Sequence, residues 1–98
     1  MISMLDVSWS NAYKRDYKRA KKRGLPMEKL DTVIDTLRRE RTLPAKYRPH
    51  PLSGKYQDVM ECHIENDWLL VYQIREDVLC LYLMRTGTHA DLFEHENP

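Results

Sequence analysis

The fold of this chain is decided by residues 59–74, VMECHIENDWLLVYQI. Within the first six residues, apolar and polar side chains alternate from Met60 to Ile64, which predicts a strand with one buried face and with Glu61 and His63 on the uncovered face. Residues 65–67 then predict a turn, because Asn and Asp favour chain reversal. The apolar run at 68–74 predicts a second, antiparallel strand in the middle of a sheet.

The flanking segments predict one more strand after this pair and a strand with two helices before it. Residues 78–84 form a third apolar run, and residues 5–9 alternate again. Ser10 is the expected N-cap of a helix that runs to about Arg23, where Gly24 ends it. Pro26 suits the first turn of a second helix, which ends near Arg41.

The second predicted helix has the strongest periodicity in the chain. Its apolar residues recur at helical spacing: Leu30, Val33, Ile34 and Leu37. Residues 43–55 contain three prolines and Gly54, which predicts a loop. The order is therefore β-α-α followed by an antiparallel meander of three or four strands, and the fold class is α+β.

Length and composition predict one domain over residues 1–98. The chain is 42% hydrophobic and 32% charged, as in soluble globular domains, and no apolar run is long enough for a membrane helix. The first residues lack the pattern of a secretory signal, so we expect a cytoplasmic protein without membrane contact. Cys62 and Cys80 are then expected to be reduced thiols.

The charges are divided unevenly along the chain. Residues 1–55 hold fourteen Lys and Arg against six Asp and Glu, whereas residues 56–98 hold two against nine. In the first predicted helix, Lys14, Lys18 and Lys22 are four residues apart, and like charges at that spacing disfavour a helix by about 0.2–0.5 kcal/mol per pair. This repetition favours a surface for RNA phosphates or for an acidic protein partner. A purely solvated face is the simpler alternative.

Three histidines, His50, His63 and His89, lie in a loop or at the ends of predicted strands. Histidine is the side chain that changes charge near neutral pH. Asp67 follows His63 within one turn, and Phe93 follows His89 by four residues. Such a mixture suits cleavage of RNA by its own 2′-hydroxyl, in which a base takes the 2′-proton, an acid protonates the departing 5′-oxygen and cations stabilise the phosphate. That chemistry needs no metal and no cofactor, and Phe93 could stack on a base.

Other interpretations of these residues stay open. An isolated histidine is more often a structural hydrogen-bonding residue, and Phe93 could anchor the C-terminal segment on the core. Three histidines and a carboxylate could also hold zinc, but the chain lacks a compact ligand pair and its cationic surroundings would repel a divalent ion. Trp68 and Tyr72 are expected in the core, which leaves Asp67 as the candidate for function in its segment.

Four segments of the chain together resemble one known family. They are residues 13–18, 43–54, 61–72 and 83–93. The second contains His-Pro-Leu-Ser-Gly at 50–54 and the last contains Arg-Thr-Gly-Thr-His at 85–89, and the two elements together are specific. From about Leu5 to Phe93 the chain resembles the RelE/ParE superfamily of bacterial type II toxins, and within it the YafQ-like branch of ribosome-dependent mRNA endonucleases.

The resemblance implies a fold and a set of acting residues. The fold would be two N-terminal helices packed on a twisted antiparallel sheet. The catalytic residues would be His50, His63, Asp67, His89 and Phe93. Those binding RNA or its phosphate would be Lys14, Lys18, Lys22, Arg48, Glu61 and Arg85. We expect His89 to be the general acid, Asp67 or His63 the base, and His50 with Arg85 the holders of the phosphate. His95 is expected to be uninvolved.

The resemblance also implies an activity and partners. The activity would be that of an mRNA interferase, an endoribonuclease that cuts message on the ribosome without a metal ion. The partners would be the ribosome, mRNA and a DinJ/RelB-like antitoxin, with operator DNA bound only through the antitoxin complex. ParE-like relatives instead inhibit targets such as gyrase by binding. A toxin of that kind would not need the histidines, so their presence favours the endoribonuclease.

Overall fold

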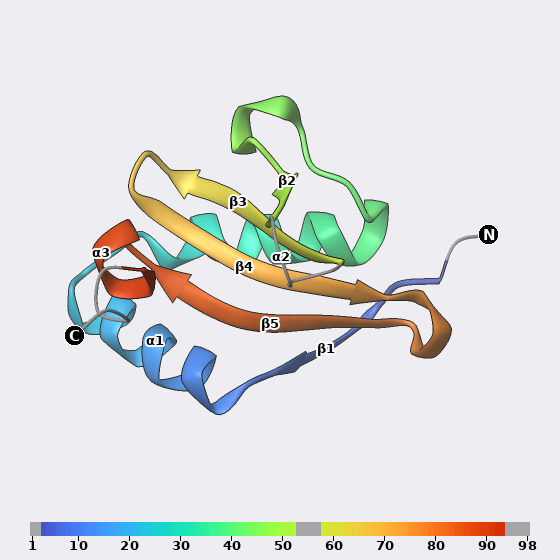
Figure 1. Ribbon diagram of the computed structural model, residues 1–98, viewed down its shortest axis with the longest axis horizontal. Helices are drawn as coiled ribbons and strands as arrows, with labels where there is room; N and C mark the ends of the chain where they lie inside the picture. The colour runs from blue at the N-terminus through green and yellow to red at the C-terminus, as the bar shows by residue number, and fades with distance from the viewer. Residues whose placement is uncertain (1–2, 53–57, 94–98) are drawn as a thin grey trace.

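The computed structural model describes residues 3–52 and 58–93, which form a twisted sheet with helices along one face and one edge (Figure 1). Within this part of the chain the strands are β1 (Asp6–Trp9), β2 (His50–Pro51), β3 (Val59–Glu65), β4 (Trp68–Arg75) and β5 (Cys80–Gly87). The helices are α1 (Asn11–Lys22), α2 (Met27–Glu40) and α3 (His89–Leu92), with short 3₁₀ turns at η1 (Ala45–Tyr47) and η2 (Glu76–Val78). The strand order in the sheet is β1-β5-β4-β3-β2.

The sheet is mixed, which corrects the expectation of a wholly antiparallel sheet. β1 runs parallel to β5, with Asp6 opposite Cys80 and Trp9 opposite Leu83, whereas β2 to β5 pair antiparallel in succession. The connectivity explains this difference, because the two helices after β1 form a long crossover that lets the first strand join the last in the same direction. The α+β class and the order of a strand, two helices and a meander are confirmed.

The ends of the two long helices follow the local signals in the sequence. Ser10 Oγ accepts a hydrogen bond from the backbone N–H of Tyr13 (2.9 Å) and so caps α1. Gly24 follows the end of α1 with a φ of 80°, a left-handed conformation that glycine adopts without strain. Pro26 directly precedes α2. These predicted boundaries are confirmed to within two residues.

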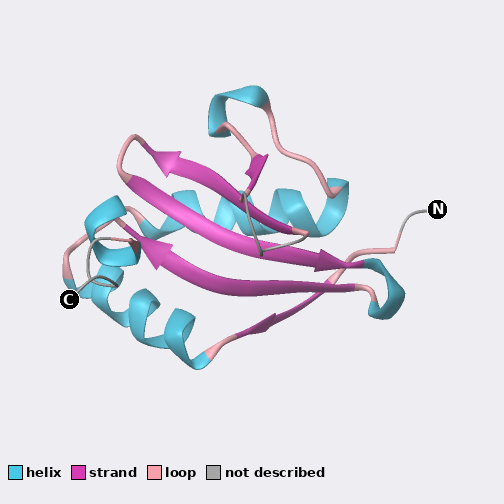
Figure 2. Cartoon of the chain, viewed as in Figure 1, coloured by secondary structure: helices cyan, strands magenta, loops and turns pink. Residues whose placement is uncertain are grey.

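Three short elements depart from the expected pattern. The predicted strand at 78–84 begins two residues later, because the chain first makes the turn η2, and it continues to Gly87. The predicted loop at 43–55 contains η1 and the two-residue strand β2. α3 was not predicted, because four residues are too few to show helical periodicity (Figure 2).

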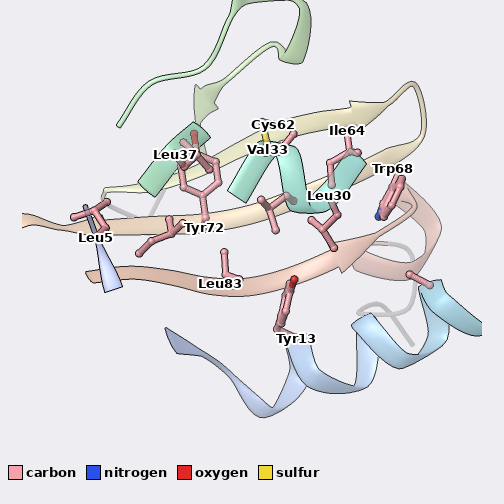
Figure 3. Packing of buried hydrophobic residues seen from close by; sticks show 13 residues of the cluster. Leu5, Tyr13, Leu30, Val33, Leu37, Cys62, Ile64, Trp68, Tyr72 and Leu83 are labelled. Atoms are coloured by element: carbon pink, nitrogen blue, oxygen red, sulfur yellow. The ribbon is translucent and has the colours of Figure 1, made fainter. Parts of the chain in front are cut away.

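The main core lies between α2 and the sheet (Figure 3). Leu30, Val33 and Leu37 of α2 are fully buried, as their spacing predicts. Trp68 and Tyr72 of β4 are each 2% exposed, which confirms their expected place in the core. This packing leaves the opposite face of the sheet free of the long helices.

That opposite face carries a smaller apolar cluster, so it is not uncovered as expected. Its buried members are Val59, Leu69, Val71 and Leu92, with Leu52 and Met84 packed against them. Leu92 belongs to α3, which follows the end of β5 and so brings apolar surface to this face. Glu61 is only 6% exposed and its carboxylate lies 3.1 Å from His50 of β2, although the alternation of β3 predicts a solvent-facing side chain.

The sequence also predicted reduced thiols and the absence of a membrane helix. Cys62 and Cys80 are free thiols, as expected, and burial raises the pKa of Cys62 to about 12. None of the helices in the described ranges is long and apolar enough to span a bilayer. Gly54 of the His-Pro-Leu-Ser-Gly element and His95 lie outside the described residues.

Candidate active site

Strand pairing brings residues far apart in sequence to one face of the sheet. His50 of β2 lies opposite Glu61 of β3, and across β4 the same row reaches Arg85 of β5. The next row links His63 of β3, across β4, to Gly87 at the end of β5. Because alternate side chains of a strand share a face, Glu61 and His63 project to the same side.

Four aromatic rings follow one another across this face: His50, His63, His89 and Phe93, here called the ring row. The ring centroids are 6.3 Å apart for His50 and His63, and 5.9 Å apart for His63 and His89. Phe93 continues the row at 6.4 Å from His89 and is 40% exposed. The structure thus brings together all the rings among the predicted catalytic residues.

Asp67, in the turn between β3 and β4, orients His89. Oδ1 of Asp67 accepts hydrogen bonds from Nδ1 of His89 at 2.6 Å and from its backbone N–H at 2.9 Å. These bonds, the backbone one most strongly, hold the pKa of Asp67 below its ordinary value. With Nδ1 bound to a carboxylate, the half-exposed imidazole of His89 keeps its Nε2 available for a substrate.

His50 lies between two acceptors. Its Nδ1 is 2.8 Å from the carbonyl oxygen of Arg48, and its Nε2 is 3.1 Å from Oε1 of Glu61. A carbonyl oxygen only accepts, so Nδ1 carries a proton, and the second contact is a hydrogen bond only when a proton lies between Nε2 and Oε1 as well. Both ring nitrogens of His50 are therefore engaged by oxygen atoms of the protein. Oε2 of Glu61 is buried and has no hydrogen-bond partner among the described residues.

His63, in the middle of the ring row, is held more loosely. Its Nδ1 lies 3.3 Å from the carbonyl oxygen of Asn66 in the β3–β4 turn. Within the described part of the chain, no hydrogen bond engages its Nε2. A neutral His63 with its proton on Nδ1 therefore presents an unoccupied lone pair at Nε2.

Structural contacts explain three positions of the Arg-Thr-Gly-Thr-His element at 85–89. Nε of Arg85 donates to Oδ2 of Asp16 in α1 at 2.7 Å. Gly87 has a φ of 155°, and a Cβ there would lie 2.9 Å from a carboxylate oxygen of α3. Thr88 caps α3 through its side chain, and this places the following histidine at the first helical position.

The predicted RNA-binding residues fall into two groups. Arg48, Glu61 and Arg85 lie in or beside the strand rows that carry the ring row. The lysines Lys14, Lys18 and Lys22 are exposed on α1, the helix that borders β5. The lysines therefore lie on a different element from the residues of the ring row.

Sequence reasoning missed a groove between β1 and α1. It has a volume of about 490 Å³ and is lined by Trp9, Tyr13, Tyr17, Lys14, Lys18 and Lys21. Trp9 is 53% exposed although it belongs to a strand, and Tyr17 is only half buried although it belongs to the apolar stripe of its helix. The signal that could have identified the groove is the repetition of aromatic and basic residues at helical spacing.

The zinc alternative depends on the three histidines and Asp67. Within residues 3–52 and 58–93, no group of three His, Cys, Asp or Glu side chains is placed to hold a metal ion. The Nδ1 atoms of all three histidines face oxygen atoms of the protein instead.

Comparison with known proteins identifies the class to which this fold and site belong. The family of the bacterial toxin of type II toxin-antitoxin systems, YafQ, matches residues 5–94. The chain belongs to this YafQ family of bacterial toxins, which confirms the resemblance seen in the sequence.

Individual relatives cover almost the whole chain. The mRNA interferase toxin YafQ of Escherichia coli K12 is 39% identical over 89 residues, which are 90% of this chain and 95% of that protein. The crystal structure of the E. coli DinJ-YafQ toxin-antitoxin complex matches with a TM-score of 0.84 at 38% identity, over 92% of this chain and 98% of that chain. A metal-bound toxin from Helicobacter pylori matches with a TM-score of 0.86 at 40% identity, over 92% of this chain and 100% of that chain.

Proposed function

We propose that this toxin is an mRNA interferase, a single-domain endoribonuclease that cleaves message on the ribosome by metal-independent acid–base catalysis. The observation that carries the proposal is the ring row with Asp67 bound to His89, because it aligns three imidazoles on one exposed face. The name of the E. coli relative, an mRNA interferase toxin, supports the same substrate class.

The proposed reaction is an attack of the 2′-hydroxyl oxygen on the adjacent phosphorus. The new P–O2′ bond forms while the P–O5′ bond breaks, which leaves a 2′,3′-cyclic phosphate and a 5′-hydroxyl end. One group takes the proton from the 2′-hydroxyl and another gives a proton to the departing 5′-oxygen. Imidazoles about 6 Å apart, as in the ring row, can serve the two sides of one phosphate.

His89 is the proposed acid and His63 the proposed base. The carboxylate of Asp67 stabilises the protonated form of His89, and Nε2 of His89 is available to donate. The sequence left Asp67 and His63 as alternative bases. We favour His63, because Oδ1 of Asp67 already accepts two hydrogen bonds and its lowered pKa makes it a weak base. Asp67 then acts by orienting His89.

The charge that develops on the phosphate would be stabilised by His50 and Arg85. His50 suits this task because contacts with Glu61 and with the carbonyl oxygen of Arg48 fix its imidazole at the end of a strand row. Arg85 lies in the same strand row, and Asp16 fixes its guanidinium. Phe93, at the exposed end of the ring row, would stack on a base next to the cut.

The ribosome and an antitoxin are the proposed partners. Ribosomal RNA would meet the exposed Lys14, Lys18 and Lys22, and Arg48 would contact phosphates near the site. An antitoxin is proposed because an E. coli relative forms a complex with the antitoxin DinJ. Operator DNA would be bound only through such a complex, and the site of action would be the cytoplasm, where ribosomes are.

The direct test is cleavage of message in a translating extract by the wild type and by His50→Ala, His63→Ala, Asp67→Ala and His89→Ala. We expect each variant to lose on the order of 10²-fold or more in rate. His95→Ala is the matched control, because it removes a histidine that is expected to take no part. Cleavage should persist when a chelator removes transition metals, provided that the ribosome keeps its magnesium. Variants that arrest growth without cutting message would indicate a ParE-like binding mechanism instead.

A further inference from the structure

Charged side chains link α1 to the ends of β5 and α3 in an alternating series. In spatial order the series is Arg23, Asp91, Arg19, Asp16 and Arg85, here called the charge chain. Nη1 of Arg23 is 2.7 Å from Oδ2 of Asp91, and Nη2 of Arg19 is 3.7 Å from the same oxygen. Arg19 is also 3.0 Å from Oδ1 of Asp16, whose Oδ2 accepts from Nε of Arg85 at 2.7 Å.

At one end of the charge chain, Asp16 fixes the last residues of β5. β1 ends at Trp9, and beyond that point α1 takes over the edge of β5. Asp16 serves that edge in place of a strand, because its Oδ2 accepts the backbone N–H of Thr86 at 3.1 Å as well as the guanidinium of Arg85. The side chain of Asp16 is only 4% exposed, so these bonds hold it in one position.

At the other end, Asp91 fixes α3. A four-residue helix is too short to persist by itself in water. Asp91 stabilises it through a reciprocal cap: its Oδ2 accepts the N–H of Thr88, and its own N–H donates to Oγ1 of Thr88, both at 3.0 Å. The bond from Arg23 then ties this cap to α1 and holds the pKa of Asp91 far below its ordinary range.

The residues that these two ends hold are those proposed to act on the phosphate. Asp16 contacts Arg85 directly, and α3 carries His89 at its first position with Phe93 just after its end. No atom of Asp16 or Asp91 takes part in the ring row. Their contribution would be to the placement of other groups, and a misplacement of about 1 Å can cost about 10²-fold in rate.

We propose that Asp16 and Asp91 are positioning residues, which place Arg85 and the His89–Phe93 segment against the scissile phosphate through the charge chain. This inference rests on the proposed function. It divides the basic residues of this region between two tasks: Arg19 in α1 and Arg23 just after its end pair with the carboxylates of the charge chain, while the exposed Lys14, Lys18 and Lys22 would contact RNA.

The first test removes the charge of Asp91 with little change of shape. With programmed ribosomes as substrate, we expect Asp91→Asn to lower kcat at least tenfold and to change KM less than twofold. Arg23→Gln should act in the same way, and Arg23→Lys should restore part of kcat because it keeps a cation near Asp91. Asp35→Asn is the matched control, since Asp35 makes a similar bond of 3.0 Å to Arg39 on the exposed side of α2. Equal kcat in Asp91→Asn and wild type would overturn the proposal.

A second measurement does not depend on activity. The backbone N–H of His89 donates to Asp67, so its hydrogen exchange reports whether α3 is in place. We expect this amide to exchange at least tenfold faster in Asp91→Asn than in wild type, and to be unchanged in Asp35→Asn. If the wild type does not cut message but the amide responds as expected, the proposed function fails while the positioning of His89 stands. An unchanged amide would refute the positioning role.

The third test concerns Asp16, whose removal from a buried place threatens the fold. Asp16→Asn is therefore paired with Arg19→Gln, which breaks the link between the two carboxylates but leaves both in place. We expect both variants to lower kcat more than KM, with Arg19→Gln keeping the thermal midpoint of the wild type within a few degrees. If Arg19→Gln folds and its kcat equals that of the wild type, Asp16 and Asp91 act independently of each other. That result would contradict a continuous charge chain.

Discussion

At the scale of the residue, the site depends on which nitrogen of each histidine the protein engages. All three imidazoles turn Nδ1 toward an oxygen of the protein, and their Nε2 atoms differ in what they meet. Nε2 of His50 lies 3.1 Å from Glu61, whereas among the described residues no hydrogen bond engages Nε2 of His63 or His89. This difference is the basis of the separate roles proposed for three side chains of the same type.

Asp67→Asn tests the role of the carboxylate behind His89. The variant keeps an oxygen for the backbone N–H of His89 but loses the negative charge that stabilises the imidazolium. We expect the cleavage rate to fall on the order of 10²-fold.

The cleavage rates of wild type and Asp67→Asn on programmed ribosomes at neutral pH check this prediction. Because the pKa of Asp67 is lowered, the wild-type carboxylate is ionised under these conditions. Asp35→Asn controls for the loss of one surface charge. A rate equal to that of the wild type would show that the charge of Asp67 does not act on His89.

At the scale of the element, α3 is a four-residue helix whose position depends on its cap and on the bond from Arg23. It follows Gly87, whose backbone conformation and proximity to Asp91 exclude a side chain. We expect Gly87→Ala to lower the free energy of unfolding by about 1–3 kcal/mol, through strain at positive φ and contact with the cap. Urea denaturation measures this loss. Gly24→Ala is the control, since Gly24 also has positive φ but nothing lies within 4 Å of its added Cβ, so a larger loss at Gly24 would contradict the account.

The cap of α3 also makes stability depend on pH. The folded-state pKa of Asp91 is depressed, chiefly by the hydrogen bond from Arg23. A depressed carboxyl pKa contributes stability that is present above the unfolded-state value of about 3.9 and is lost as the pH falls toward the folded-state value. We therefore expect the thermal midpoint of the wild type to exceed that of Asp91→Asn at neutral pH, and the two to converge in acid. A difference that persists at the lowest pH would show that charge is not the cause.

At the scale of the whole molecule, most of the fold could be predicted and the site only in part. Helical spacing located α2, alternation located β3, and continuous apolar runs located β4 and β5. These patterns could not show that β1 joins β5 in parallel, since pairing between distant strands leaves no local pattern. The alternation of β3 placed Glu61 on the solvent side, and it could not show that His50 of the short strand β2 lies against this carboxylate.

The histidines were identified as a group because they repeat near strand ends, but their order in the ring row needed the strand register. The roles of Asp16 and Asp91 could not be predicted at all. A lone acid in a basic helix and an acid near the end of the chain are ordinary in sequence. Only the docking of α1 on the edge of β5 brings them to the same arginine.

Because the lysines of α1 lie apart from the ring row, we expect RNA binding to be weakened by substitutions that leave the ring row intact. We expect the triple variant Lys14→Ala, Lys18→Ala and Lys22→Ala to bind single-stranded RNA with a weaker salt dependence. At about 0.7 per phosphate contact, the slope of log K against log salt should fall by about 2. Fluorescence anisotropy over a salt series measures the slope. Removing the charges of Lys29, Arg39 and Arg75, which lie outside α1, is the control, and an equal change there would refute a dedicated surface.

The parallel pair at the edge of the sheet also affects the order in which a newly made chain can complete its fold. β1 lies near the start of the chain and is synthesised early. Because Asp6 pairs opposite Cys80, this strand has no partner until residues 80–83 have been synthesised and released. Contacts across so much sequence form late, because a long loop must close first. The ring row likewise needs the chain as far as Phe93. Both the sheet and the site proposed to cut message therefore form only after the chain up to Phe93 has been made.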